Sequence, residues 1–264
     1  SKERKRRPSP PFITSTLQQE AARKLGFTTS RTMRVAQKLY EGVAIGEEGS
    51  VGLISYMRTD SVNLSVDAVV EIRDVIARDF GTQAVPDKPN EYKSKSKNAQ
   101  EAHEAIRPTD FSREKAGQGD EGKLYDLIFK RAMASQMATA QLERTTVTFR
   151  DATGQHELRA TGQVIRFPGF LAVYQEGFDD ADDDESGLLP VMKSGDCPAK
   201  RAVDATQHFT QPPPRFSEAS LVKALEEYGI GRPSTYASII QTLLFRKYVE
   251  LESRSFRPSD VGRA

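Results

Sequence analysis

The strongest constraint on the fold is a change of hydrophobic periodicity near residue 143. Before that point apolar residues recur at helical spacing, and after it apolar and polar residues alternate in short runs. Period-two alternation is typical of strands, and a period near 3.6 is typical of helices. A proline run, QPPPR at 211–215, ends the alternating region, and helical spacing then returns. The sequence therefore predicts a multidomain α+β protein.

Four regions follow from these boundaries. Residues 1–14 are charged and proline-rich, with no predicted element of their own, and enter the β-rich region. Residues 15–142 are predicted to be helical, residues 143–214 β-rich, and residues 215–264 helical again. Because the chain begins and ends abruptly, we expect it to be a piece of a longer protein.

The helical region is expected to contain five helices. The first opens at Ser15, with Gln18 at capping-box spacing, and the third opens at Ser65. The others cover 29–42, a short AQEAHEAIRP helix at 99–108 that ends at its proline, and a long helix over 121–142. The third helix presents an apolar stripe of Ala68, Ile72, Val75 and Ile76.

The β-rich region and the C-terminal region have their own signals. Strands are expected at 144–152, 156–167, 170–177 and 201–210. Beyond the prolines, a helix capped by Ser217 and a second helix at 235–248 enclose a short glycine-containing turn, and 249–259 is strand-like. That spacing is typical of a helix-turn-helix-like unit.

Composition excludes several classes of protein. Cys197 is the only cysteine, so neither an internal disulfide nor a cysteine-rich zinc site can form. No run of 18 apolar residues is present, which argues against a membrane span. The 38 basic and 37 acidic residues nearly cancel, so any nucleic-acid surface must be a local patch. The acidic run DDADDDE at 179–185 is expected to be a solvated loop, not a magnesium site, because like charges in a run repel.

The stretch GLISYMRTDSVNLS at 52–65 holds the first candidate site. In an extended chain Tyr56 and Arg58 would face the same way, so a phenol and a guanidinium would share one surface. A phenol can attack phosphorus while a fixed cation stabilises charge on the phosphoryl oxygens. The spacing alone equally allows a tyrosine at a strand edge beside a surface arginine.

Two further stretches could bind phosphate. On the predicted 99–108 helix, His103 and Arg107 would share a face, although a solvated charged helix gives the same pattern. In GIGRPSTYASI, Arg232, Ser234 and Thr235 would lie at a helix N-terminus, where backbone amides favour anions. A well-capped helix with nothing bound is the alternative there.

Together these stretches resemble one family. PFITSTLQQEAARKLGF, LYEG, GLISYMRTDSVNLS, AQEAHEAIRPTD, the long run QHFTQPPPRFSEASLVKALEEYGIGRPSTYASII, and RKYVEL occur in this order. Their sequence and order are similar to the bacterial DNA topoisomerase I family of type IA topoisomerases. The resemblance runs from about residue 11 to about residue 261.

The resemblance implies roles for individual residues. Tyr56 would be the nucleophile that forms a 5′-phosphotyrosyl bond with single-stranded DNA, and Arg58 would contact the scissile region. His103 would lie near the bound phosphates, with Arg107 on the same motif as a DNA contact. Arg232, Ser234 and Thr235 would line the single-strand groove.

The resemblance also implies an architecture and partners. The family forms a torus, so 15–142 would be the gate domain, 143–214 the hinge, and 215–264 part of the base. Relaxation of negatively supercoiled DNA would need Mg²⁺ but no ATP. The magnesium ligands would belong to an N-terminal Toprim domain that nothing here matches, so this chain alone is expected not to relax DNA. The few additional residues of VAIGEEGSV, at 43–51, are expected to form a surface loop. A monomeric protein in the cytoplasm, at the nucleoid, is expected.

Two other functions remain open from the residues. One is a single-stranded DNA-binding module without catalysis, in which Tyr56 is structural. The other is an interaction scaffold. Covalent trapping of DNA distinguishes a topoisomerase from both alternatives. A salt-dependent affinity for single strands distinguishes the binding module from the scaffold.

Overall fold

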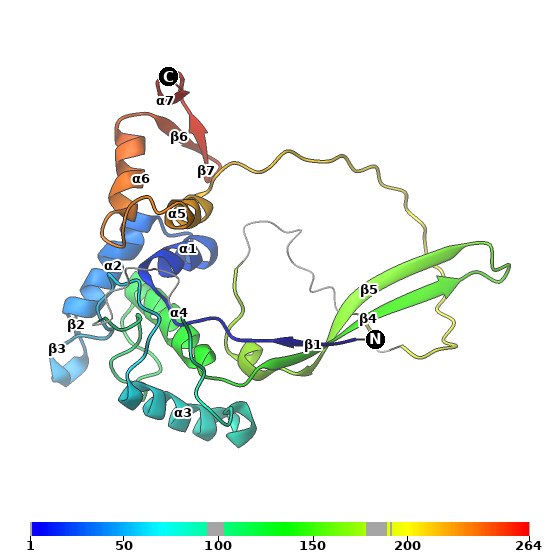
Figure 1. Cartoon of the computed structure of the whole chain (residues 1–264), viewed down its shortest axis with the longest axis horizontal. Coiled ribbons are helices and arrows are strands. Elements are labelled where there is room, and N and C mark those ends of the chain that lie inside the picture. The colour runs from blue at the N-terminus through cyan, green and yellow to red at the C-terminus, as the bar shows by residue number, and fades with distance from the viewer. Residues whose placement is uncertain (1, 94–102, 178–188, 191, 264) are drawn as a thin grey trace.

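The computed structural model describes residues 2–93, 103–177, 189–190 and 192–263 of the chain. Within these residues the fold is a mixture of helices and sheet, in which a helical body bears a long β-ribbon on one side and a C-terminal segment on another (Figure 1). We call residues 12–135 with 168–177 the helical body, and residues 215–263 the C-terminal segment. No helix of the described chain is long and apolar enough to span a membrane.

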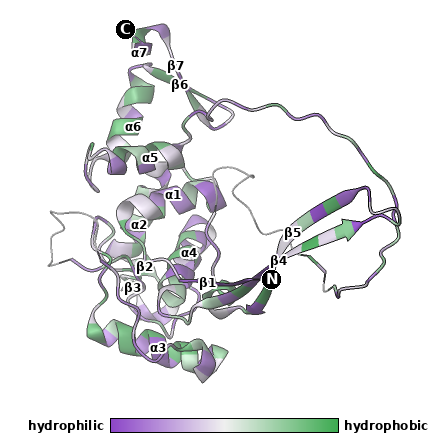
Figure 2. Cartoon of the chain, turned by 45° about the vertical axis from the view of Figure 1, so that its right-hand side comes forward, coloured by the Kyte–Doolittle hydropathy of each residue, from purple (hydrophilic) through white to green (hydrophobic). Residues whose placement is uncertain are grey.

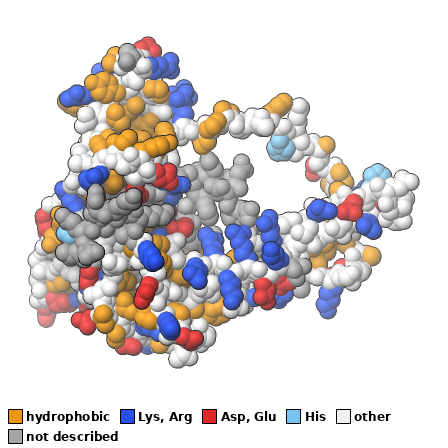
Figure 3. Space-filling model, viewed as in Figure 1, with side chains coloured by type: hydrophobic (Ala, Val, Ile, Leu, Met, Phe, Trp, Pro, Cys, Tyr) orange, Lys and Arg blue, Asp and Glu red, His pale blue; other side chains and the backbone are white. Residues whose placement is uncertain are grey.

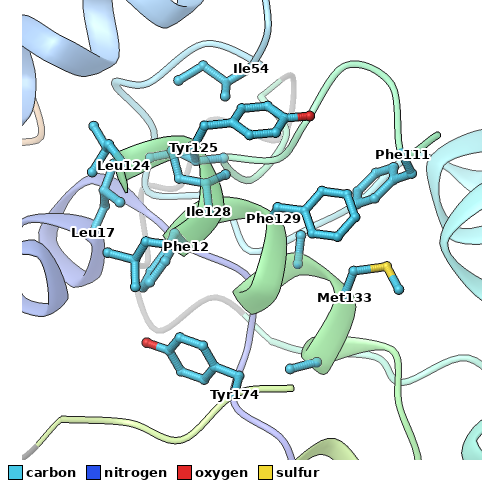
Figure 4. Packing of buried hydrophobic residues seen from close by; sticks show 14 of the residues in the cluster. Phe12, Leu17, Ile54, Phe111, Leu124, Tyr125, Ile128, Phe129, Met133 and Tyr174 are labelled. Carbon is cyan, nitrogen blue, oxygen red and sulfur yellow. The ribbon is translucent and has the colours of Figure 1, made fainter. Parts of the chain in front are cut away.

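The helical body contains four α-helices, α1 (Thr14–Leu25), α2 (Thr29–Glu41), α3 (Val66–Phe80) and α4 (Gly119–Ser135). A 3₁₀ turn, η2 (Thr82–Ala84), follows α3. Their apolar faces meet in one continuous core, which Figure 4 shows from close by. The largest fully buried side chains of this core include Tyr125, Phe12, Phe111, Leu17, Ile54, Leu124 and Ile128.

The start of α3 agrees with the sequence, and the start of α1 does not. Ser65 caps α3 by accepting a hydrogen bond from the Ala68 amide, and the predicted stripe of α3 is buried. The predicted capping box at Ser15 and Gln18 is wrong. The helix begins at Thr14, the Thr16 hydroxyl accepts from the Ile13 amide, and both Ser15 and Gln18 are buried inside the fold.

The three-stranded antiparallel sheet has the order β1 (Lys2–Arg6), β4 (Ala140–Arg150), β5 (Glu157–Phe167). The N-terminal residues thus form a strand, with Arg4 opposite Leu142, where none was predicted. The helix predicted to reach residue 142 ends at Ser135 instead. Along β4 only Ala140 and Leu142 are buried, and the rest of the ribbon extends away from the body (Figure 2).

Two strands predicted in the β-rich region are absent from the described structure. The stretch 170–177 begins within a 3₁₀ turn, η3 (Gly169–Ala172), because its aromatic side chains Phe170 and Tyr174 pack into the helical body. The stretch 201–210 has no regular structure and runs exposed along the arc that Figure 1 shows in yellow. The acidic run 179–185 lies outside the described residues.

The AQEAHEAIRP stretch is extended rather than helical where it is described, from residue 103 onward. Ile106 pairs with Phe12 and Pro108 pairs with Ile54 in isolated antiparallel bridges. Ala105 and Ile106 are fully buried, and their amides donate to the carbonyls of Asn63 and Phe12. Tertiary pairing of this segment therefore overrides its helical pattern. Residues 99–102 lie outside the described residues.

The C-terminal segment consists of α5 (Glu218–Glu227), α6 (Tyr236–Phe245), the hairpin β6 (Val249–Glu252) and β7 (Ser255–Pro258), and α7 (Asp260–Arg263). Ser217 caps α5, as predicted. This segment has its own small core, in which the buried residues are Val222, Leu225, Tyr236, Ile240 and Phe256. Helix α5 packs on α1, and α6 packs on α2 (Figure 1).

Candidate nucleophile site and nucleic-acid interface

Within residues 52–59, which we call the nucleophile segment, buried and exposed side chains alternate over 56–59, after the two buried residues Leu53 and Ile54. Met57 is 3% exposed and Thr59 is buried, whereas Tyr56 is 40% exposed and Arg58 is exposed. The phenol of Tyr56 and the guanidinium of Arg58 are thus exposed on either side of the buried Met57. The segment is not a regular strand, since the chain bends at Ser55, Met57 and Arg58, and it pairs in an isolated bridge at Ile54.

Hydrogen bonds from three directions hold the nucleophile segment. The Ser55 amide donates to the Arg107 carbonyl at 2.8 Å, and the Ser55 hydroxyl accepts from the Arg107 amide at 2.9 Å. The Leu53 amide donates to the Leu39 carbonyl at the end of α2, at 2.7 Å. The buried Thr14 hydroxyl donates to the Met57 carbonyl at 2.7 Å. The backbone around Tyr56 is thus fixed on both sides.

Two aromatic rings lie against Tyr56. The ring centroid of Tyr40, on the last turn of α2, is 5.3 Å away at an interplanar angle of 67°. The imidazole of His103 is 6.0 Å away at 41°. The structure therefore brings Tyr56 and His103 together, although 47 positions separate them in the sequence. An imidazole at this position could exchange a proton near a phosphate bound at the phenol.

Arg107 lies beside the nucleophile segment, but its guanidinium has partners within the protein. It donates to the Glu104 carboxylate at 2.6 Å and to the Pro108 carbonyl at 2.9 Å, and its side chain is 18% exposed. Its clearest structural contribution is through its backbone, which pairs with Ser55.

A cavity of about 390 Å³ joins the nucleophile segment to the C-terminal segment. Arg58 of the nucleophile segment and Ser234 of the C-terminal segment both line it. Most of the remaining lining side chains are small or polar and come from α2 and α6, namely Ser30, Met33, Pro233, Ala237, Ser238, Gln241 and Thr242. A guanidinium facing a row of hydroxyl and amide groups can bind an anionic, hydrogen-bonding chain such as a phosphodiester backbone.

The GRPST turn before α6 has an internal hydrogen-bond network. Thr235 is the N-cap of α6, and its hydroxyl accepts from the Arg232 amide at 2.8 Å. The Arg232 guanidinium donates to the Gly231 carbonyl at 2.7 Å, while Ser234 is exposed at the cavity. The structure therefore places Ser234 at the same cavity as Arg58, and holds Arg232 and Thr235 in the turn that contains Ser234.

Positive charge also gathers on the three-stranded sheet. Lys2, Arg4 and Arg6 alternate along β1 and so share one face, and Arg144 lies opposite Lys2 on β4. Figure 3 shows Lys and Arg side chains over this part of the molecule. A local cationic face of this kind is what the near-neutral overall charge requires of a nucleic-acid-binding protein.

The pKa values of four other tyrosines argue against each of them as the nucleophile. Burial raises the pKa of Tyr92, Tyr125 and Tyr174 well above the ordinary value, and it also raises the pKa of Tyr236. A phenol held neutral in this way is a poor nucleophile. Tyr56 is partly exposed and lies within the site, which favours it over these four.

A resident metal site is not evident in the described part of the chain. No three His, Cys, Asp or Glu side chains gather there closely enough to hold an ion.

Comparison with known proteins identifies the family to which the chain belongs. A family model described as DNA topoisomerase matches residues 1–264, so the chain belongs to the DNA topoisomerase family. It is 66% identical to DNA topoisomerase 1 of Xylella fastidiosa strain 9a5c, covering 100% of this chain and 33% of the relative. The corresponding protein of Zymomonas mobilis is 59% identical, over 98% of this chain and 21% of the relative.

Among solved structures, the full-length topoisomerase I of Thermotoga maritima matches with a TM-score of 0.77 and 38% identity, over 99% of this chain and 42% of that one. The chain thus spans a third or less of the length of these two curated relatives.

The sequence motifs did not single out Tyr40, Ser55 or Gly52 as contributors to the site. Tyr40 lies in the LYEG stretch, but only the fold shows why it is near Tyr56. The stretch expected to be a loop, 43–51, is a hairpin of β2 (Val43–Ala44) and β3 (Ser50–Val51) around a 3₁₀ turn, η1 (Gly46–Glu48). It returns the chain to the end of α2. The GEEG turn within this stretch was the sequence signal that could have indicated a hairpin.

Proposed function

We propose that this chain is the nucleophile-bearing part of a type IA DNA topoisomerase, and that Tyr56 cleaves one strand of DNA. The observation that carries the proposal is an exposed phenol on a fixed backbone, with Arg58 beyond Met57 and His103 against its ring. Membership of the DNA topoisomerase family supports it.

The chemical step would be a transesterification. The Tyr56 phenol gives up its proton as its oxygen attacks the phosphorus, the bond from phosphorus to the 3′-oxygen breaks, and that oxygen takes up a proton. The 5′-phosphate stays on the tyrosine, which conserves the energy of the phosphodiester, so no ATP is needed. The reverse attack by the 3′-hydroxyl reseals the strand and frees Tyr56. Arg58 would stabilise negative charge on the phosphoryl oxygens.

The remaining assignments belong to the same proposal. Residues 15–142 would be the gate, 143–214 the hinge with the incoming residues 1–14, and 215–264 part of the base. Single-stranded DNA would run along the cavity between Arg58 and Ser234, with Arg232, Thr235 and Arg107 as further contacts. The whole protein, a monomer at the nucleoid, would require Mg²⁺ bound by residues outside this chain. The 264-residue chain by itself would not relax supercoiled DNA.

Covalent trapping tests this proposal. In the full-length protein that contains this sequence, denaturation during reaction with a labelled single strand should leave DNA attached to the wild type and none to Tyr56→Phe. The variant should still bind the oligonucleotide, because the ring and the binding surface are retained. A wild-type protein that binds single strands but forms no adduct would instead be a binding module, and an adduct on the Phe variant would place the nucleophile elsewhere.

A further inference from the structure

The last turn of α2 lies directly under the nucleophile segment. The Leu53 amide donates to the Leu39 carbonyl at 2.7 Å, so the segment continues the hydrogen bonding of the helix end. Gly52 permits this approach, because a Cβ at that position would lie 2.8 Å from the Tyr40 carbonyl oxygen. The close approach, rather than an unusual backbone conformation, is what requires glycine here.

This approach brings the Tyr40 ring against the Tyr56 ring. The centroids are 5.3 Å apart and the planes are inclined at 67°, which is an edge-to-face contact. The exposed fractions of the two residues are similar, at 42% for Tyr40 and 40% for Tyr56. Tyr56 is therefore not held by burial, and its orientation depends on the few groups that touch its ring.

We propose that Tyr40 is a positioning residue for the reaction, which orients the Tyr56 phenol toward phosphorus through edge-to-face packing at the end of α2. This inference rests on the proposed function of Tyr56. Fixing a nucleophile in its reactive geometry contributes to rate without contributing to ground-state binding. The Tyr40 ring, rather than its hydroxyl, supplies the effect.

The inference predicts a particular pattern in single-turnover cleavage by the full-length protein. Tyr40→Leu removes the ring but keeps a good helix former, and it should slow adduct formation about 5- to 30-fold, within the range that misplacement of a reacting group produces. Tyr40→Phe keeps the ring and should cleave within about twofold of the wild type, since the hydroxyl has no assigned role. The affinity of both variants for a non-cleavable oligonucleotide should equal that of the wild type.

Two further variants, one control and one second disruption of the contact, complete the test. Phe80→Leu makes the same kind of change at the exposed end of α3 and should leave the rate unchanged. Gly52→Ala disturbs the contact from the other side, because its Cβ would push the segment away from the Tyr40 carbonyl, and it should also slow cleavage. Since Tyr40 is partly exposed, its loss leaves the core of the body intact, which circular dichroism can verify.

The outcomes separate this inference from the proposed function. No adduct in the wild type would refute the function of Tyr56 itself. A wild-type adduct with an unimpaired Tyr40→Leu rate would refute only the role of Tyr40. A Tyr40→Phe rate as low as that of Tyr40→Leu would also overturn the inference, because the hydroxyl would then be the active group. Weakened oligonucleotide binding that accounts for the slower cleavage would show a binding role instead.

Discussion

The helical body and the C-terminal segment carry two halves of the candidate site, but they are built with cores of different size. The body carries Tyr56 and Arg58 on a segment whose buried residues join a continuous core, which includes Phe12, Leu17 and Ile128. The C-terminal segment, which supplies Ser234, has a core of only five buried residues. A small core gives little independent stability. The nucleophile is therefore held by the strongly packed region, and one wall of the cavity by the weakly packed one.

The contact between the two regions is partly polar. The Glu218 carboxylate, at the start of α5, accepts from the Thr29 amide, at the start of α2, at 2.6 Å. Both residues are buried, at 9% and 1% exposure. A carboxylate at a helix N-terminus is favoured by the helix dipole, and here one carboxylate serves two helices. A buried polar contact of this kind between two regions can be specific without being as stable as an apolar core.

The largest effect is expected from the core of the body. Phe12 is fully buried, and its truncation in Phe12→Ala should lower the free energy of unfolding by about 3–5 kcal/mol. The matched change Phe245→Ala, at a side chain that is 88% exposed on α6, should cost less than about 0.5 kcal/mol. Urea unfolding measures both. Equal losses would mean that the two regions do not differ as described.

A smaller and more local effect is expected at Glu218. Glu218→Ala leaves the buried Thr29 amide without its acceptor, which should cost about 1–3 kcal/mol. Hydrogen exchange should show the loss in α5 and α6, while α3 and α4 keep their protection. Glu227→Ala, at the exposed end of α5, is the control and should change neither. Equal loss of protection across the body would contradict a separable segment.

Acid should weaken the attachment of residues 174–177 to the body. Burial by itself would raise the pKa of Glu176, but the Arg131 guanidinium at 2.8 Å lowers it below its usual range. Because the pKa is lower in the folded state, this stabilisation is present above about pH 4.5 and is lost as pH falls through the folded-state value.

Glu176→Gln should therefore make the unfolding free energy fall less steeply below pH 4.5. The difference should be about 1 kcal/mol or less, since the Glu176 side chain is 38% exposed. A variant whose pH profile is as steep as that of the wild type would show that the pair does not contribute.

The smallest effect is expected at Arg232, in the C-terminal segment. Arg232→Ala should weaken binding of all single-stranded oligonucleotides alike and reduce the slope of log affinity against log salt by about one unit. Arg78→Ala on α3, which removes a cation already paired with Asp79, should leave the slope unchanged. A changed base preference with an unchanged slope would mean that Arg232 reads bases and not phosphates.

Helix-capping residues and short-range alternation predicted the elements that neighbouring residues along the chain determine. Ser65 and Ser217 begin their helices as expected, and alternation predicted both β4 and β5. The failures occur where distant residues decide the outcome. The helical pattern around His103 is overridden by pairing of Ile106 with Phe12, and the strand predicted at 170–177 by burial of Phe170 and Tyr174.

The candidate site shows the same division. The shared exposure of Tyr56 and Arg58 was expected from their spacing, because residues two apart share a face of an extended chain, although the chain bends at Met57 and Arg58. The contact of Tyr56 with Tyr40 could not be read from the sequence, because it depends on a hairpin that was expected to be a loop. The cavity shared by Arg58 and Ser234 depends on the packing of α6 against α2, which no local pattern encodes.

The most direct test is to identify the residue that carries DNA. The full-length protein is trapped with a single-stranded oligonucleotide and digested, and the DNA-bearing peptide is sequenced by mass spectrometry. We expect a single modified residue, Tyr56, with the 5′-phosphate on its phenol oxygen. Attachment at Tyr40, whose ring lies only 5.3 Å from that of Tyr56, or at any other residue would contradict it.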